Sequence, residues 1–257
     1  MDSVPEVTEV QDRGPAAYIA EFIGTLLLVF FITAVVSLYV TVPSQQNPTP
    51  FIDFTVIGLV HAFLLFALIQ TLALISGAHF NPAVTAVMTM LRQIKPPDAA
   101  VFVVAQLAGA VGGALLTKLL LEDEGRPVDY GITAISARVD EAILPAMFVE
   151  GIGTFFLVWV ILGVAVNPRG TKEWAGLAIG ATLGMLVMVL APLTGAGFNP
   201  ARSFGPAIVS GVFNGGGDFL LVYVLAPVIG ALVSGFAYLT LIQTPGQKGP
   251  GGAEPVG

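Results

Sequence analysis

Long apolar runs recur along the chain, separated by short polar stretches. Each run holds about 20 residues or more, enough as a helix to cross about 30 Å of hydrocarbon. Two further apolar stretches, 81–91 and 199–210, are about half that length, and each begins with an Asn-Pro pair. Short, Pro-interrupted segments at matching places are typical of a site near the bilayer midplane. The pattern predicts six membrane-spanning helices, at 17–40, 54–75, 98–121, 144–166, 174–193 and 219–243.

The two halves of the chain repeat the same motifs in the same order. Segment 21–25 (EFIGT) corresponds to 150–154 (EGIGT), and segment 76–84 (SGAHFNPAV) corresponds to 194–202 (TGAGFNPAR). Three spans per half is an odd number, so the second half must cross the membrane upside down relative to the first. The sequence therefore predicts an all-α membrane protein with six transmembrane helices and two re-entrant half-helices in an inverted repeat.

This organisation sets the expected boundaries along the chain. They are an N-terminal tail (1–16), a first repeat (17–121), an outer connecting loop (122–143), a second repeat (144–243) and a disordered Pro/Gly-rich tail (244–257). Both tails lie on one side of the membrane, because the number of spans is even. That side carries more Lys and Arg than the other, so the positive-inside rule predicts cytoplasmic termini in a multi-pass protein of the cell membrane (plasma or inner).

Composition excludes several other classes of protein. The chain is 55% hydrophobic and only 11% charged, whereas a soluble domain carries about 25% charged residues. A net charge of -7 argues against a nucleic-acid partner, because no basic surface is available for phosphates. With no Cys and only two His, we expect no disulfide, no metal site, no cofactor and no catalytic residue.

The two Asn-Pro-Ala motifs carry the candidate chemistry. Asn is a favoured helix N-cap and Pro a favoured first helical residue, so 81–83 and 199–201 each predict the start of a half-helix. The half-helices enter from opposite sides, so their positive dipole ends meet near the centre. The segment before each motif must then line a water-filled path, because lipid cannot satisfy irregular backbone. The motif residues are Asn81, Pro82, Ala83, Asn199, Pro200 and Ala201, and the expected pore carbonyls are those of Gly77, Ala78, His79, Gly195 and Gly197.

The repeat is broken where one half carries a charge. Arg202 lies three residues beyond Asn199, whereas the equivalent residue in the first half is Val84. An intramembrane guanidinium indicates a functional site. His61 and Val187 lie at a similar depth in their spans, which predicts one constriction formed by all three.

Glu21 and Glu150 occupy equivalent places in the first and fourth spans. As buried carboxylates they are expected to accept hydrogen bonds from the loose N–H groups of the re-entrant segments. The alternative is a proton relay, as in pumps.

With these motifs the chain resembles the major intrinsic protein family, the aquaporins and aquaglyceroporins. The resemblance covers about 17–243, and its most specific segments are 76–85 and 197–206. It implies one pore per protomer, a homotetramer and a four-residue selectivity filter. In this chain the filter positions correspond to His61, Val187, Ala196 and Arg202.

The filter departs from the strict water-channel pattern. That pattern commonly has Phe at position 61 and His at position 187, and His61 instead resembles the tonoplast branch. The glycerol-conducting branch is disfavoured, because Ser203 and Ala207 stand where it usually has Asp and a basic residue. Val224, however, replaces a Trp that is common in water channels.

These features predict a passive channel in the lipid bilayer rather than an enzyme. The expected cargo is water, together with small neutral solutes such as ammonia or hydrogen peroxide, with ions and protons excluded. Three alternatives remain open at this point. They are an alternating-access transporter coupled through Glu21 or Glu150, a glycerol- or urea-conducting member of the same family, and a structural relative with a closed pore.

Overall fold

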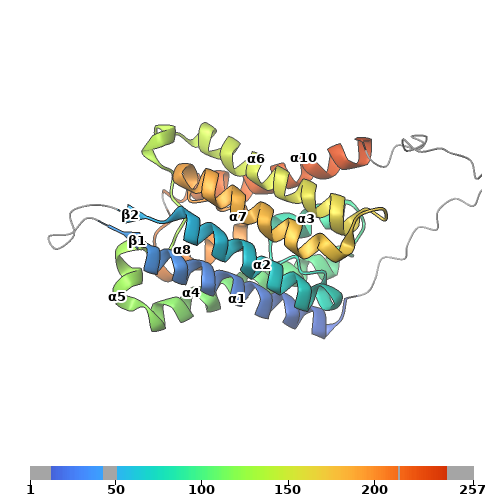
Figure 1. Cartoon of the computed structure of the whole chain (residues 1–257), viewed down its shortest axis with the longest axis horizontal. Helices are drawn as coiled ribbons and strands as arrows, with labels where there is room; N and C mark the ends of the chain where they lie inside the picture. Colours follow the sequence, from blue (N-terminus) through green and yellow to red (C-terminus); the bar gives the residue numbers. More distant parts are fainter. Residues whose placement is uncertain (1–12, 43–50, 214, 242–257) are drawn as a thin grey trace, which may run out of the picture.

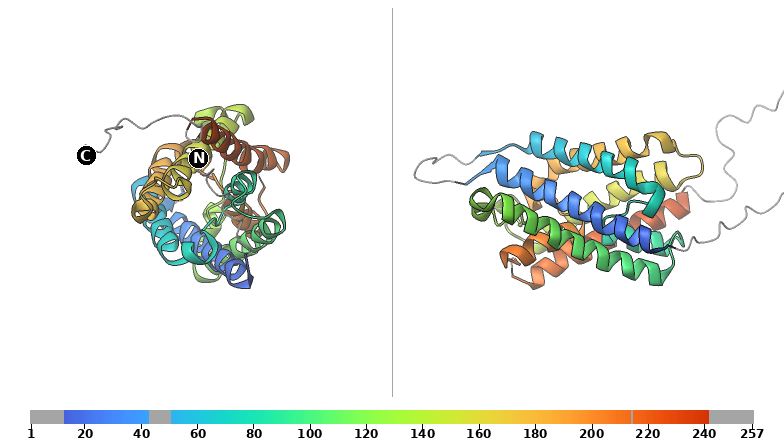
Figure 2. Two further views of the ribbon diagram at one scale, coloured as in Figure 1. Left: turned by 90° about the vertical axis from the view of Figure 1, so that its right-hand side faces the viewer. Right: turned by 90° about the horizontal axis from the view of Figure 1, so that it is seen from below.

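The computed structural model describes residues 13–42, 51–213 and 215–241. Six of its helices are long and apolar enough to cross a membrane, and together they form an elongated bundle (Figure 1). Viewed along the bundle, the helices surround a central region (Figure 2). The predicted all-α membrane fold is therefore confirmed. The expected tail 244–257 and most of the expected tail 1–16 lie outside the described residues.

The spanning helices differ from the predicted spans mainly at their ends. They are α1 (Pro15–Tyr39), α2 (Phe54–Ser76), α4 (Pro96–Leu120), α6 (Ile143–Ile161), α7 (Ala175–Thr194) and α10 (Ala226–Leu241). The half-helices are α3 (Pro82–Met90) and α8 (Pro200–Ser210). Two spans contain a π-helical segment, Leu162–Val166 after α6 and Leu220–Leu225 between α9 (Gly217–Phe219) and α10. A 3-10 turn, Lys172–Trp174, leads into α7.

The helix packing follows the inverted repeat. In the first repeat α1 packs against α4, and in the second α6 packs against α10. Helices α2 and α7, which are equivalent to each other, pack together across the repeats. Each half-helix also contacts the last helix of the other repeat, α3 against α10 and α8 against α4. The two repeats thus share one interior instead of forming separate domains.

Small residues allow the helices to cross closely. A Cβ atom added at Gly109 or Gly113 of α4 would overlap the backbone carbonyls of Phe22 or Leu26 in α1. In the second repeat, a Cβ at Gly230 would overlap the carbonyl of Gly151. Close backbone contact at small residues is the usual packing mode of membrane helices.

The segments that connect the helices lie at the two opposite ends of the bundle (Figure 1). The first residues of α1 and the last of α10 lie at the same end (Figure 1). Two short antiparallel strands, β1 (Val40–Thr41) and β2 (Phe51–Ile52), lie at the other end together with α5 (Glu122–Gly125). We call this second end the outer end, following the expected orientation.

The outer connection, predicted from the sequence as a loop at 122–143, contains short helical turns. After α5 it forms 3-10 turns at Arg126–Val128 and Ala137–Val139. Tyr130 and Thr133 within it are only 5% and 1% exposed. This segment therefore packs into the protein and contributes to the interior.

Candidate functional site

The two half-helices begin with the same cap. The side-chain oxygen of Asn81 accepts a 2.9 Å hydrogen bond from the N–H of Ala83, and Asn199 accepts an equivalent 2.9 Å bond from Ala201. Pro82 and Pro200 occupy the first helical position in each case. Both half-helices therefore point their positive dipole ends at the centre of the bundle.

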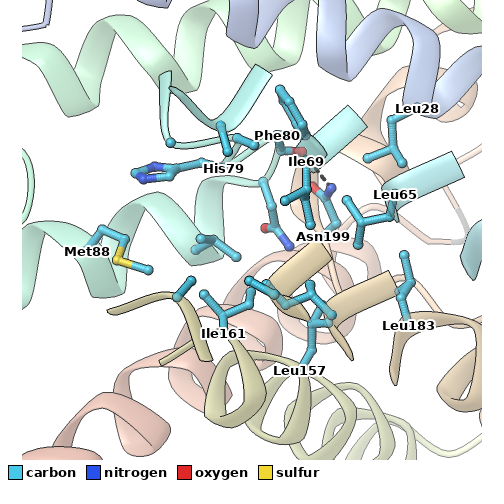
Figure 3. Close-up of a pocket in the computed structure, with 18 of the residues that line it drawn as sticks. Leu28, Leu65, Ile69, His79, Phe80, Met88, Leu157, Ile161, Leu183 and Asn199 are labelled. Atoms are coloured by element: carbon cyan, nitrogen blue, oxygen red, sulfur yellow. Dashed lines mark hydrogen bonds between the residues drawn. The ribbon is translucent and has the colours of Figure 1, made fainter. Parts of the chain in front are cut away.

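The tips of the half-helices are also joined to each other. The amide nitrogen of Asn81 donates to the carbonyl of Phe198 at 2.9 Å. That of Asn199 donates to the carbonyl of Phe80 at 2.8 Å, and Figure 3 shows this second bond. Each amide group has two N–H bonds, so each Asn keeps one donor for another partner. The sequence indicated the caps but not this reciprocal pair of bonds.

The segments before the half-helices have matching irregular backbones. Gly77 and Gly195 end α2 and α7 in the left-handed region, with φ of 89° and 78°. Positive φ is unfavourable for other residues and has to be held in place by the surroundings. Four non-glycine residues here adopt it, namely Ala78, Phe80, Ala196 and Phe198.

Irregular backbone leaves carbonyl groups without helical partners. Within the described part of the chain, no hydrogen bond is accepted by the carbonyls of Gly77, Ala78 or His79, or by those of Gly195 and Gly197. Buried backbone acceptors need a hydrogen-bond donor, which these carbonyls lack within the described chain. Gly77, Ala78, His79 and Gly197 line the central cavity, whereas Gly195 does not.

Glu21 holds the first re-entrant segment from behind. Its carboxylate accepts hydrogen bonds from the N–H groups of His79 and Phe80 at 2.9 and 2.7 Å. It also accepts from the hydroxyl of Ser76 at 2.6 Å and the amide of Gln106 at 2.7 Å. The side chain is fully buried, and these four donors compensate for its removal from water.

Glu150 has the equivalent position in the second repeat. It accepts from the N–H groups of Gly197 and Phe198 at 2.9 and 2.6 Å, and from the hydroxyl of Thr194 at 2.6 Å. Tyr223 supports the same segment by donating to the carbonyl of Thr194 at 2.9 Å. Neither Glu21 nor Glu150 lines the cavity.

A cavity of about 990 Å³ runs past the half-helix tips. At the end where α1 begins it is lined by Arg13, Gln93 and Lys172, and beyond the tips by His61 and Arg202. One side of it is polar, formed by the re-entrant segments and both Asn side chains. The opposite wall is apolar, and its residues include Leu28, Leu65, Ile69, Leu157, Ile161 and Leu183 (Figure 3).

Three of the four expected filter residues line this cavity together. They are His61, Ala196 and Arg202. The fourth, Val187, is 1% exposed and belongs to the same apolar cluster as Ala196, but it does not line the cavity. The ring of His61 is oriented by its Nδ1 atom, which lies 2.7 Å from the carbonyl of Ile57.

The guanidinium of Arg202 is held by the outer connection. Its Nη1 atom donates to the carbonyl of Gly131 at 2.9 Å, and the side chain is 4% exposed. Its Nε atom is buried without a hydrogen-bond partner among the described residues. Gly131 carries no signal in the sequence that would link it to Arg202.

Two further polar contacts complete the first half of the site. Gln106 donates from its amide to both Glu21 and Thr85, the latter at 3.0 Å. Gln106 was not among the residues predicted from the sequence, although a polar amide in the middle of an apolar span indicates a buried hydrogen-bonding role. His79 lies with its Nδ1 atom 3.1 Å from the hydroxyl of Thr85 and packs its ring edge-on to Phe102.

Among the described residues, no group of three or more His, Cys, Asp or Glu side chains could hold a metal ion. Around the half-helix tips and beyond them, the site is built from the two Asn amides, backbone carbonyls, the His61 ring and the Arg202 guanidinium. Such groups can bind and orient small hydrogen-bonding molecules.

Comparison with known proteins gives matches over most of the chain. The family model for the major intrinsic proteins matches residues 10–238. The glycerol uptake facilitator protein-like 6 of Lactiplantibacillus plantarum is 38% identical over 221 residues, which cover 85% of this chain and 94% of the relative. The aquaporin AqpM of Methanothermobacter marburgensis is 33% identical over 233 residues, covering 86% and 94%.

A solved structure shares the fold. The aquaglyceroporin from Plasmodium falciparum superimposes with a TM-score of 0.72 at 24% identity, over 88% of this chain and 96% of that one. The likeness supports the same arrangement of helices and half-helices.

Proposed function

The chain belongs to the major intrinsic protein family, a family of membrane channels, and from that premise we propose that it conducts water passively. The proposal includes small neutral solutes such as ammonia or hydrogen peroxide and excludes ions and protons. The observation that carries it is the pair of amide donors, Asn81 and Asn199, at the tips of two joined half-helices on the polar side of the cavity, opposite an apolar wall.

This geometry suits a single file of water. A water molecule at the tips can accept from the free N–H of either Asn, while carbonyls before each motif accept from waters on both sides. The apolar wall opposite offers no competing partners, so a molecule is held on one side only. Weak, repeated binding of this kind lets molecules enter and leave quickly.

The same features disfavour cations. Two positive helix ends face the midpoint, and Arg202 adds a full positive charge on the outer side. A water that accepts from both Asn amides turns its own hydrogens away from the tips. This orientation interrupts the chain of hydrogen bonds that a migrating proton needs.

We assign solute selectivity to a ring of four residues. His61, Ala196 and Arg202 line the cavity, and Val187, which does not line it, is buried in the same apolar cluster as Ala196. Val and Ala contribute little polarity there, so a ring wider than that of a strict water channel is expected. The relatives include both an aquaporin and a glycerol uptake facilitator-like protein, so the choice between water and larger solutes depends on this ring.

The two buried carboxylates argue against a coupled transporter. Glu21 and Glu150 are fully buried, are bonded to three or four donors each and lie away from the cavity wall. A coupling group has to exchange protons or ions with the path. We therefore give both residues the role of supporting the re-entrant segments.

Stopped-flow shrinkage of proteoliposomes tests the proposal. We expect water permeability well above that of empty vesicles, with a flux that rises linearly with the osmotic gradient. Permeability equal to empty vesicles would contradict the channel, and saturable, ion-dependent uptake would point to a transporter. Parallel measurements with ammonia, hydrogen peroxide, urea and glycerol then rank the solutes.

Orientation and assembly complete the proposal. We place both termini in the cytoplasm and the protein in the cell membrane, because the end where α1 begins carries Arg13, Arg92, Lys95, Arg169 and Lys172. We also propose a homotetramer with one pore in each protomer, on the basis of family membership.

A further inference from the structure

The outer connection and the last turn of α4 carry a cluster of side chains that the proposed function leaves without a role. Glu122 and Arg126 form an ion pair one helical turn apart. The hydroxyl of Tyr130 donates to the other oxygen of Glu122 at 2.8 Å, and the ammonium of Lys118 lies 5.5 Å from the centre of the Tyr130 ring. We call Lys118, Glu122, Arg126 and Tyr130 the outer clamp.

The outer clamp favours the ionised form of Glu122. The hydrogen bond from the Arg126 guanidinium, followed by that from Tyr130, holds the pKa of the Glu122 carboxyl below its usual range. A carboxylate is a stronger acceptor than a neutral carboxyl. The bond from Tyr130 is therefore charge-assisted at neutral pH.

Tyr130 directly precedes Gly131, whose carbonyl accepts the hydrogen bond from Arg202. Asp129, Tyr130 and Gly131 are three consecutive residues with positive φ, at 49°, 52° and 73°. For Asp and Tyr this conformation is unfavourable and persists only where the surroundings impose it. The direction of the Gly131 carbonyl therefore depends on the contacts that fix this turn.

Those contacts converge on Tyr130. Its N–H donates to the carbonyl of Gly125 at 2.8 Å, and the N–H of Gly131 donates to Val128 at 2.9 Å. The Tyr130 ring lies over Gly125 so closely that a Cβ there would be 2.6 Å from ring atom Cδ1. The side chain is buried, with only 5% of the residue exposed.

The guanidinium of Arg202 makes few hydrogen bonds within the described chain. Of its guanidinium, only Nη1 has a hydrogen-bond partner in the described chain, and that partner is the Gly131 carbonyl. If this bond is lost, the guanidinium keeps its electrostatic attraction to Glu150, but it has no other hydrogen-bond partner among the described residues, and it lies at the cavity wall.

We propose that the outer clamp positions the Gly131 carbonyl and, through it, the guanidinium of Arg202 at the side of the path, with Tyr130 as the positioning residue. This inference rests on the proposed function, because it gives Arg202 a fixed place in the filter. Without the clamp, the guanidinium turns toward the path and obstructs water.

The first experiment compares water permeability per folded channel in proteoliposomes. Tyr130→Ala lowers it by about fivefold, the change in an equilibrium expected when the single hydrogen bond between Arg202 and the Gly131 carbonyl is lost. Tyr130→Phe and Glu122→Gln each lower it less, because both keep the Tyr130 ring in place. The double variant Tyr130→Phe/Glu122→Gln lowers it little further, because Tyr130→Phe removes the bond between Tyr130 and Glu122 that Glu122→Gln only weakens. Glu124→Gln is the matched control, since it removes one exposed charge from the same short helix and leaves permeability unchanged.

A second variant separates positioning from folding. Adding Arg202→Ala to Tyr130→Ala raises water permeability back to that of Arg202→Ala alone, because the obstructing group is gone. A loss that persists without Arg202 overturns the proposal. Gly125→Ala moves the ring without removing it, at a φ of -79° that alanine adopts readily, and it is expected to lower permeability in the same way.

Structure determination of Tyr130→Ala by electron cryomicroscopy keeps the two proposals distinguishable. If the wild-type protein conducts no water, the proposed function fails, and the clamp is then judged by the position of Arg202 alone. A separation between Nη1 and the Gly131 carbonyl that stays at 2.9 Å in the variant would contradict the clamp. Displacement of the guanidinium toward the cavity would support it.

Discussion

At the scale of single residues, the site depends on buried polar groups whose partners are backbone atoms. Glu150 illustrates this, because two of its three donors are the N–H groups of Gly197 and Phe198. Those N–H groups belong to a segment without helical hydrogen bonds, so the carboxylate replaces what a helix would have supplied. Its fixed place sets the direction of the carbonyls in the same segment.

We expect Glu150→Gln to destabilise the protein. An amide has only one acceptor oxygen, so its NH₂ group must face a backbone N–H that then loses its partner. An unsatisfied buried donor costs about 1–3 kcal/mol, which corresponds to a fall of roughly 2–4 °C in melting temperature per kcal/mol in a chain of this size.

Thermal unfolding in detergent measures this effect. Glu173→Gln is the control, because it makes the same chemical change at an exposed position. An unchanged melting temperature for Glu150→Gln would show that the carboxylate is not needed for support.

Individual contacts are where the structure departs most from what the sequence predicts. The contacts of Glu21 and Glu150 with the re-entrant segments could be anticipated, because the same residue recurs at the same place in both repeats. The contact between Arg202 and Gly131 could not, since a backbone carbonyl is available at every residue and its direction depends on the fold. For the same reason the motif predicts the Asn caps but not which carbonyl accepts the second bond of each Asn.

At the scale of elements, the spans follow from hydropathy and their ends from local residues. Gly77 and Gly195 stop α2 and α7 in the left-handed conformation, and Asn-Pro starts each half-helix. The π-helical segment Leu220–Leu225 was not expected from the apolar pattern. It ends two residues before Pro227, which has no N–H to bond the carbonyl of Tyr223 within that segment.

The crossing of α1 and α4 gives a matched pair of substitutions. At Gly109 an added methyl group would overlap the Phe22 backbone carbonyl, which cannot move without shifting a helix. At Gly112, one turn away, it would meet only the end of the Leu26 side chain at 3.2 Å.

We therefore expect Gly109→Ala to lower the melting temperature by several degrees, through overpacking that costs about 1–3 kcal/mol. Gly112→Ala should change it little, because the gain in helix propensity of up to about 1 kcal/mol offsets a small side-chain shift. Melting curves of both variants in the same detergent test this, and equal effects would contradict the close crossing.

At the scale of the whole molecule, large apolar side chains cover much of the outside. Leu74, Leu119 and Phe236 are 99%, 76% and 66% exposed. Such a surface is stable only against lipid or another protein. Six apolar helices of spanning length indicate that lipid covers most of it.

Assembly is tested on the intact protein. If the proposed homotetramer is right, native mass spectrometry in a mild detergent gives four times the chain mass of 26.7 kDa. If the measured mass is that of a single chain under conditions in which the protein still conducts water, the tetramer is not required for conduction. The composition of one chain gives no direct signal for this state, because lipid contacts and protein contacts in a membrane select similar apolar residues.

The two bonds that join the half-helix tips also constrain the order of biosynthesis. The two residues joined by one bond are 117 positions apart in the sequence, and those joined by the other are 119 positions apart. The first repeat is therefore synthesised long before the second motif leaves the ribosome. Until then the Asn81 amide and the Phe80 carbonyl lack the hydrogen-bond partners that the second motif supplies. Exposing these polar groups to lipid acyl chains costs several kcal/mol. The first re-entrant segment must consequently wait in a hydrated or chaperoned location during insertion. It can settle at mid-depth only after translation of the second motif.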